Sequence, residues 1–178
     1  MSAVMMRVAS EADAAEIAAL VNRAYRPAAE SGGWTHEAAW VAGARTSATM
    51  VERLFRPGSA VLVLCRGGAI VACVNVEAIP APAGAAAYIG MLATEPAAQA
   101  AGLGKRMLAC AEQYAVAEFG ARAFRMTVLT SRPELIAFYE RRGYVRSGVV
   151  EDFPVAAGYG LPRVDGLRLE TLVKALGA

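Results

Sequence analysis

The sequence predicts an α/β fold in three layers, with a central mixed, mostly antiparallel sheet flanked by helices. Two patterns carry this prediction. Strand-like runs in the first half of the chain are joined by a tight glycine turn, which is typical of antiparallel pairing. Residues 88 to 130 are instead patterned as strand, helix and strand, an order that joins parallel strands through a crossover.

The first of the expected elements is a short strand at residues 5–8. The Ser10 and Asp13 spacing of a capping box follows, and apolar residues recur at helical spacing to about Tyr25. A second helical stretch is expected from Thr35 through Val41, and a further turn or two at residues 50–55.

The middle of the chain carries a predicted hairpin. Residues 60–65 and 69–78 are rich in β-branched side chains and flank Arg66-Gly67-Gly68. A buried strand is expected next. That strand covers residues 88–93, and a long helix follows it and stops at Gly120. After a strand at 124–130, a second helix starts near Pro133 and stops at Gly143. Two closing strands are expected at 144–150 and 167–174.

Composition narrows the class of protein. The 178 residues are 56% hydrophobic, which suits one domain over residues 1–178. No run approaches the roughly 20 apolar residues of a membrane-spanning helix, and no secretory signal precedes Ser10. A net charge of +2 with dispersed arginines gives no stripe for nucleic acid or membrane. We expect a cytoplasmic protein, and a homodimer is compatible with the sequence.

Cysteine usage predicts no metal site. The three cysteines include no pair at metal-ligand spacing and have no histidine partner nearby. Small buried hydrophobic side chains in a reducing compartment are the simplest interpretation.

A glycine pair supplies the first chemical signal. Gly102 and Gly104 stand between a predicted strand and the first turn of a helix, where unpaired N–H groups and the helix dipole favour an anion. A plain strand-to-helix turn and a phosphate site are both compatible with this pair alone. The dinucleotide pattern fails because it needs Gly at Met107, and the Walker pattern fails because it needs Gly at Gln99.

Two longer motifs resemble one known family. Residues 92–105, LATEPAAQAAGLGK, resemble the acetyl-coenzyme A signature of the GNAT superfamily, and residues 134–144, ELIAFYERRGY, resemble its second signature. The motifs occur in the expected order with one strand between them. The resemblance covers roughly residues 5 to 150 and implies a GNAT-like fold that uses acetyl-coenzyme A as co-substrate.

The resemblance also implies a coenzyme site. The strand backbone is expected to bond the pantetheine arm, and the glycine loop is expected to give N–H groups to the pyrophosphate. Arg132 occupies the place where relatives often carry an asparagine that contacts the coenzyme, so that contact is open. The expected coenzyme-binding residues are Met91, Leu92, Ala93, Thr94, Gln99, Ala100, Ala101, Gly102, Leu103, Gly104, Lys105, Arg132 and Tyr139.

By the same resemblance, two residues take catalytic roles. Tyr139 is positioned to give its proton to the sulfur of coenzyme A, since a phenol is a competent donor to a thiolate. A backbone N–H near Leu92 stabilises the oxyanion of the tetrahedral intermediate. The alternative for Tyr139 is a core aromatic beside Phe138.

The acceptor pocket is expected to draw on the first helices and their loop. By the same resemblance, Tyr25, Arg26, Trp34 and Arg45 are its expected lining, and an aromatic with arginines suits an amine that bears a carboxylate. Core packing and solvated charge are the alternatives. Glu77 is either the base that deprotonates the amine or an exposed strand residue.

The function predicted is N-acetylation of a primary amine on a small-molecule acceptor by direct transfer. A catalytically silent coenzyme A-binding module and an acetyltransferase acting on a protein amine are the alternatives. An α/β domain without a ligand would require both motifs to be coincidence.

Overall fold

A computed structural model describes residues 3–28, 35–80 and 85–177. Within these ranges one seven-stranded sheet has the order β1-β3-β4-β5-β6-β9-β7. Every neighbouring pair is antiparallel except β5 and β6, which are parallel, so the predicted mixed, mostly antiparallel sheet is confirmed. The strands are β1 (Val4–Val8), β3 (Ser59–Arg66), β4 (Ala69–Ile79), β5 (Ala86–Thr94), β6 (Ala123–Leu129), β7 (Val145–Asp152) and β9 (Arg168–Ala175).

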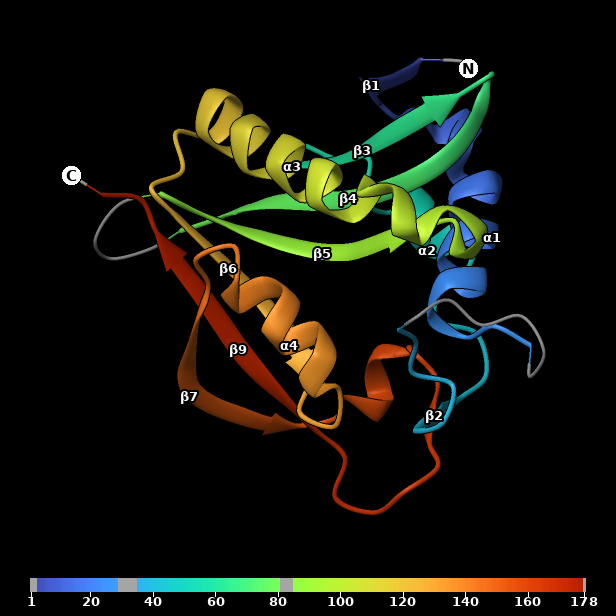
Figure 1. Ribbon diagram of the computed structural model, residues 1–178, viewed down its shortest axis with the longest axis vertical. Helices are drawn as coiled ribbons and strands as arrows, with labels where there is room; N and C mark the ends of the chain where they lie inside the picture. Colours follow the sequence, from blue (N-terminus) through green and yellow to red (C-terminus); the bar gives the residue numbers. More distant parts are fainter. Residues whose placement is uncertain (1–2, 29–34, 81–84, 178) are drawn as a thin grey trace.

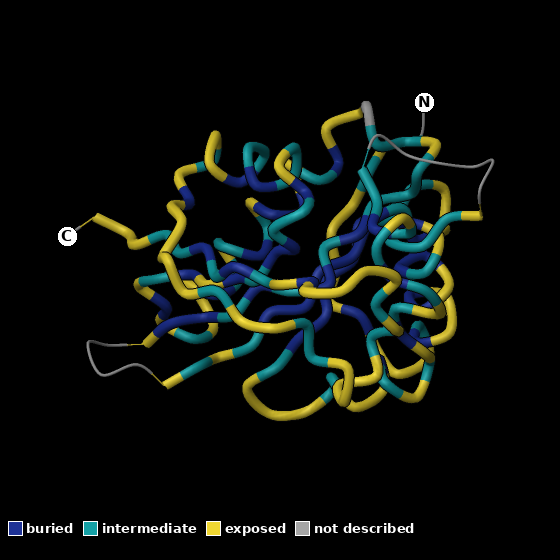
Figure 2. Tube along the Cα trace, turned by 90° about the horizontal axis from the view of Figure 1, so that it is seen from below, coloured by how far each residue is buried: buried dark blue, intermediate teal, exposed yellow. Residues whose placement is uncertain are grey.

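Helices cover both faces of the sheet, as predicted (Figure 1). The alternation of β3 shows the layers, because Val61 and Val63 pack with the α1 side and Leu62 and Leu64 with the α3 side. Buried residues are concentrated in the central strands and the inward helix faces (Figure 2). One face carries α1 (Ala14–Tyr25) and α2 (Ala48–Glu52), and the other carries α3 (Leu103–Phe119) and α4 (Pro133–Glu140).

Local signals fix the ends of the two long helices. The Ser10 N–H donates to Asp13 Oδ2 at 2.8 Å, and the short helix η1 (Glu11–Asp13) leads directly into α1. Gly102 with φ 73° precedes α3 and Gly120 with φ 63° follows it, and both conformations favour glycine. These boundaries agree with the prediction.

The sheet opens between β5 and β6. Their parallel pairing joins only Ala86–Tyr88 to Ala123–Arg125, and beyond it the two strands diverge (Figure 1). On the other side of β5 the register with β4 shifts between Cys73 and Asn75, beside Met91 at φ 55°. A bulge of this kind bends a strand and increases its twist. The divergence leaves room for a ligand between the strands.

The prediction of a helix from Thr35 through Val41 is wrong. The N–H groups of Trp40 and Val41 both donate to the Glu37 carbonyl at 3.0 Å, which closes a single turn. The chain then forms β2 (Val41–Ala42), which pairs with β8 (Leu161–Pro162) from the late loop. This tertiary contact overrides a weak local helix signal. The helical turn expected at residues 50–55 is found slightly earlier, as α2.

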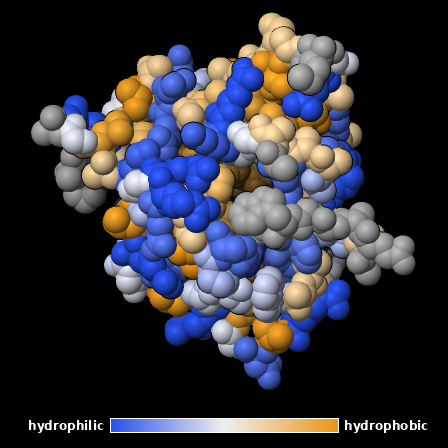
Figure 3. Space-filling model, in the orientation of Figure 1, coloured by the Kyte–Doolittle hydropathy of each residue, from blue (hydrophilic) through white to orange (hydrophobic). Residues whose placement is uncertain are grey.

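The surface carries mixed polarity. On the face drawn in Figure 3, hydrophobic and hydrophilic residues are interspersed. Among the described residues, no helix is long and apolar enough to cross a bilayer, and no cluster of His, Cys, Asp and Glu has the geometry of a metal site.

Candidate active site

Two cavities meet in the opening between β5 and β6. The first, of about 290 Å³, lies between the end of β5, the start of α3 and α4, and we call it the glycine-loop cavity. The second, of about 230 Å³, lies between β4, β5, β6 and the segments around Arg45 and Tyr159, and we call it the central cavity. The side chains that line both are Tyr25, Leu92, Arg132, Leu135 and Tyr139. A group bound at this junction is reached from both sides.

The glycine loop forms one end of the first cavity. It follows the short helix η2 (Pro96–Ala101), which includes Ala100. Gly102 and Gly104 both line the cavity, and each position favours glycine for a different reason. Gly102 has a left-handed backbone, whereas a Cβ on Gly104 would point at the Phe138 and Thr94 side chains, 3.6 and 3.8 Å away. The first N–H groups of α3 have no partner within the helix, so this end favours an anion.

The other residues of the loop differ in exposure. Gln99 and Lys105 line the cavity, and Lys105 is exposed. Leu103 is buried in the core on the α3 side, and Ala101 is exposed outside the lining. Leu103 can therefore reach a ligand only through its backbone.

The bulged half of β5 forms the wall between the cavities. Ala93 and Thr94 face the glycine-loop cavity, Met91 faces the central cavity, and Leu92 faces both. A positive φ at a methionine is strained, because its Cβ crowds the backbone. The bulge places the backbone of Leu92 at the point where the cavities meet.

Tyr139 lies at the same junction, on α4. Its side chain is buried, and its ring makes edge-to-face contacts with Phe138 and Tyr144 at centroid distances of 5.2 and 5.9 Å. Burial is the main cause that raises the pKa of Tyr139, and the nearby Tyr25 raises it further. Within the described chain the Tyr139 hydroxyl makes no hydrogen bond. It is a protonated phenol that is free to donate to a ligand.

Arg132 is part of a buried ion network, and its side chain is largely shielded from solvent. Its side chain is 6% exposed, donates to Thr35 Oγ1 at 2.7 Å, and lies 3.6 Å from Glu37 Oε2. Glu37 also accepts hydrogen bonds from Arg26 at 2.6 and 3.0 Å. The Arg132 Nε is buried without a hydrogen bond to any described residue and lies 3.9 Å from Glu134. Arg132 lines both cavities, so a contact with a bound ligand is sterically open.

Arg26 acts as a clamp behind the central cavity and does not line it. Besides Glu37, its guanidinium donates to the carbonyls of Gly43 at 2.8 Å and Tyr159 at 2.5 Å. Next to it, Gly160 has φ 109°, and a Cβ there would lie 2.5 Å from the Ala42 carbonyl. The clamp fastens the late loop to the segment after α1. Trp34 lies outside the described residues.

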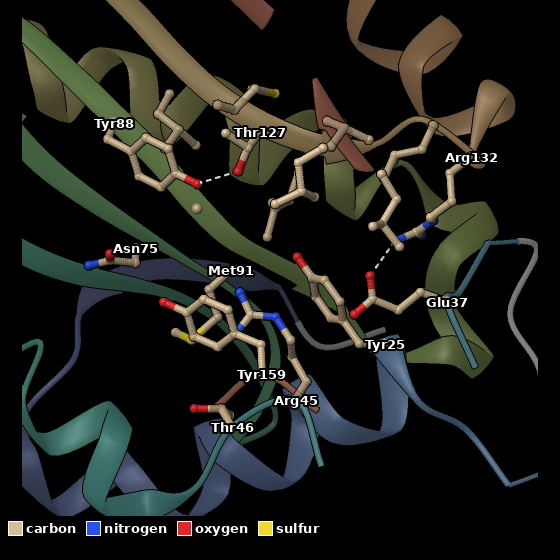
Figure 4. Close-up of a pocket in the computed structure, with 18 of the residues that line it drawn as sticks. Tyr25, Glu37, Arg45, Thr46, Asn75, Tyr88, Met91, Thr127, Arg132 and Tyr159 are labelled. Atoms are coloured by element: carbon tan, nitrogen blue, oxygen red, sulfur yellow. Dashed lines mark hydrogen bonds and ion pairs between the residues drawn. The ribbon is translucent and has the colours of Figure 1, made fainter. Parts of the chain in front are cut away.

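Polar side chains from three strands, β4, β5 and β6, face into the central cavity (Figure 4). The Tyr88 and Thr127 hydroxyls are 2.8 Å apart across the start of the opening. Glu77 pairs with Tyr88 in the β4–β5 register, and it also accepts a hydrogen bond from Arg56 at 2.8 Å. Asn75, on the same face of β4, donates to the Ala60 carbonyl at 3.1 Å. Both carboxylates of the cavity, Glu37 and Glu77, are therefore held by arginines.

Sequence comparison assigns this arrangement to a family. The acetyltransferase (GNAT) family matches residues 15–144, which include the glycine loop, the bulge in β5 and Tyr139. The chain belongs to the GNAT acetyltransferase family. No curated protein matches its sequence.

Solved GNAT structures share the whole fold. An acetyltransferase of the GNAT family from Streptococcus pneumoniae has a TM-score of 0.68 and 20% identity, over 98% of this chain and 100% of that one. The alanine N-acetyltransferase of a ribosomal protein from Escherichia coli has a TM-score of 0.71 and 15% identity, over 99% and 96%. A spermidine N-acetyltransferase chimera from Vibrio cholerae and hSSAT has a TM-score of 0.67 and 15% identity, over 97% and 95%. At such identities the likeness is one of fold.

The two GNAT motifs lie around the glycine-loop cavity, whereas several residues that line the central cavity belong to neither motif. Tyr159 reaches the central cavity from the late loop, and no local pattern marks it. The positions of Asn75 and Tyr88 in the sequence could have predicted that they line this cavity. Asn75 shares its β4 face with Glu77 by strand alternation, and Tyr88 begins the strand that carries the first motif.

Proposed function

We propose that this GNAT protein transfers an acetyl group directly from acetyl-coenzyme A to a primary amine of a small molecule. The meeting of the two cavities at Leu92 and Tyr139 carries the proposal. A thioester delivered through one cavity and an amine delivered through the other would meet at these residues, as a direct transfer requires.

The coenzyme fits the glycine-loop cavity by its chemistry. Its pyrophosphate is an anion, and the N-terminus of α3 offers backbone N–H groups beside Gly102 and Gly104, which line the cavity. Its pantetheine arm carries amides, which suit the backbone of Met91 to Thr94 in the manner of an added strand. Arg132 Nε offers one further donor beside this path.

The reaction needs three proton transfers. The neutral amine attacks the thioester carbon, the carbonyl oxygen gains charge, and the Leu92 N–H stabilises it. The C–S bond then breaks, and the thiolate takes the Tyr139 proton to leave as coenzyme A thiol. The proton lost by the nitrogen returns the Tyr139 oxygen to its phenol form through solvent. Glu77 is the proposed base for the substrate ammonium, through water near the Tyr88 and Thr127 hydroxyls.

The cysteines support a direct transfer. Burial raises the pKa of Cys73 to about 12, which keeps its thiol protonated. None of the three cysteines lines either cavity. An acetyl-cysteine intermediate therefore has no residue to form on.

The shape of the central cavity favours a small acceptor over a protein amine. Its volume of about 230 Å³ is below the usual range of about 300–1,000 Å³ for ligand sites. The β2–β8 pair and the Arg26 clamp fasten the late loop across one side of it. A protein N-terminus or lysine needs an open groove for the chain that carries it.

The test combines binding with turnover. Calorimetric titration with acetyl-coenzyme A should show one site per chain, and the Gly104→Val variant should bind more weakly. Release of free thiol is then measured with a panel of small amines and with peptides, and products are identified by mass. Binding without turnover on any amine would favour the silent module, turnover on peptides alone would favour a protein amine, and absence of binding would reject the proposal.

A further inference from the structure

Among the described residues, one cation that lines the central cavity, Arg45, lacks an anionic partner. Within residues 3–28, 35–80 and 85–177, no carboxylate lies within ion-pair distance of the Arg45 guanidinium, and its side chain makes no hydrogen bond there. By contrast, Arg132 in the same wall is paired with Glu37. A half-buried guanidinium that faces a cavity without a counter-ion favours an anionic ligand.

Two aromatic rings hold this guanidinium in place. The Arg45 Cζ lies 4.1 Å from the ring centroid of Tyr159 and 5.3 Å from that of Tyr25. Figure 4 shows the Arg45 side chain between these rings, within the cavity. Contact with rings uses the faces of the guanidinium, so its N–H edges are left for a planar anion. A carboxylate matches that edge with two parallel hydrogen bonds.

The charges around Arg45 support the same conclusion. The two carboxylates that line the cavity are neutralised, Glu37 by Arg26 and Arg132 and Glu77 by Arg56. Glu37 is therefore not free to pair with Arg45, and Glu77, the proposed base, is already shared with Arg56, so neither is left to bind a second ammonium group of a polyamine. The cavity therefore attracts anions and disfavours polycations.

The small volume and the position of Arg45 define the acceptor further. Arg45, Tyr25 and Tyr139 all line a cavity of about 230 Å³, and Tyr25 also reaches the glycine-loop cavity. An acceptor anchored by its carboxylate at Arg45 can direct an amine a few bonds away to the junction at Tyr139.

We propose that the acceptor is a small amino acid or short amino carboxylate, whose carboxylate is bound by Arg45 between Tyr25 and Tyr159. This inference rests on the proposed N-acetyltransferase function. It assigns Arg45 as the residue that makes the enzyme prefer amines that carry a carboxylate over amines that do not.

The experiment compares matched acceptors. Values of kcat/KM are measured by thiol release for α-amino acids, for their carboxamides and for the amines that lack the carboxylate, with spermidine as a polycation. We expect the acid to be preferred over its amide. In Arg45→Gln this acid-to-amide ratio should fall by about 10- to 100-fold, as expected for a charge-assisted pair. The acid-to-amide ratio should fall less in Arg45→Lys, because lysine keeps the positive charge.

A matched control isolates the role of the cavity. Arg53 follows α2, is exposed and does not line the cavity, so Arg53→Gln makes the same change of charge without touching the site. It should leave the acid-to-amide ratio unchanged, and melting temperatures of both variants establish that they fold.

The outcomes separate the two proposals. If amides, plain amines or spermidine are acetylated as well as the acids, or if Arg45→Gln keeps the parent ratio, the carboxylate assignment is overturned while the acetyltransferase function stands. If Arg53→Gln lowers the ratio equally, general surface charge is responsible and the assignment is overturned. If acetyl-coenzyme A binds but no amine of any class is acetylated, the proposed function fails and the acceptor assignment fails with it.

Discussion

The Asn22 side chain holds the backbone of Arg45. Its Oδ1 accepts hydrogen bonds from the N–H groups of Arg45 at 2.8 Å and Thr46 at 3.1 Å, and its Nδ2 donates to the Thr46 carbonyl at 3.0 Å. One side chain of α1 thereby fixes the segment that carries the unpaired guanidinium. The position of Arg45 depends on Asn22 although Asn22 does not line the cavity.

Asn22→Ala should weaken acceptor binding more than coenzyme binding. Three hydrogen bonds are lost, so the free energy of unfolding should fall by about 1–3 kcal/mol. The KM for the acceptor should rise roughly 10-fold, because Arg45 is displaced. Asn22→Asp keeps the accepting oxygen, so it should retain most of the free energy of unfolding and most of the acceptor affinity. Chemical unfolding and steady-state kinetics measure the effects, and an equal rise in the KM of coenzyme and acceptor would contradict this role.

Tyr139→Phe should slow acetyl transfer by roughly 10²- to 10⁴-fold, the usual contribution of a positioned general acid. Its ring contacts with Phe138 and Tyr144 are kept, so folding and coenzyme affinity should change little. Tyr114→Phe is the control, since Tyr114 lies on α3 and lines neither cavity. Single-turnover transfer is the measurement, and a Phe variant that transfers at the parent rate would make Tyr139 a core aromatic only.

The pH dependence of the same step follows from the raised pKa of Tyr139. Because burial raises that pKa above its ordinary value of about 10, the phenol stays protonated through neutral and mildly alkaline pH. The transfer rate should therefore rise with pH as the amine loses its proton, and reach a plateau without declining below about pH 10. A decline with a midpoint near pH 8 or 9 would indicate that a different acid donates the proton.

Gly104→Val should lower the affinity for acetyl-coenzyme A by about 10-fold or more, because its side chain would fill the space above the start of α3. A single Cβ meets Phe138 and Thr94 only at ordinary contact distance, so Gly104→Ala should fold and show a smaller loss. Ala109→Val places the same side chain on the exposed face of α3 and serves as the control. Calorimetric titration gives the affinities, and unchanged binding in folded Gly104→Val would exclude this cradle.

Asp13→Asn should lower stability at neutral pH but not in strong acid. The Arg7 guanidinium donates to Asp13 at 2.8 and 2.9 Å and, as the main cause, lowers the pKa of Asp13 to about 2. Since the pKa in the unfolded chain is about 3.9, the stabilisation is complete above that value and is lost as the pH falls toward 2.

The measurement for Asp13 is urea unfolding at several pH values. The free energy of unfolding should fall by about 1 kcal/mol near pH 7, and the difference from the parent should shrink between about pH 4 and pH 2. Glu11→Gln, an exposed change in the same short helix, is the control. A difference that is constant with pH would show that the ion pair with Arg7 is not its source.

The features predicted correctly from the sequence were those with local causes. The hairpin of β3 and β4, the ends of α3 at Gly102 and Gly120, and the crossover from β5 to β6 each follow from a turn residue or an apolar period. The left-handed backbone of Met91 could not be predicted, because nothing in a methionine signals a positive φ.

The acceptor side was less predictable for a related reason. Arg45 and Tyr159 are more than 100 residues apart in the chain and meet only through tertiary contacts. The helix expected from Thr35 to Val41 failed because Glu37 is drawn into a buried ion network with Arg26, which a local pattern does not contain. Motifs described the proposed coenzyme side, whereas loop packing determines the proposed acceptor side.

The strand order also constrains how the molecule assembles. β9 lies between β6 and β7 although it follows both along the chain. β7 pairs with β9 in the sheet, so it is joined to β6 only through β9, which pairs with β6 across the intervening α4 and β7. Such a non-local insertion is a slow event in folding. Phe153 and Tyr159 lie between β7 and β9 and line the central cavity, so this cavity is complete only when β9 is in place beside β6, whereas the glycine loop precedes β6 in the chain.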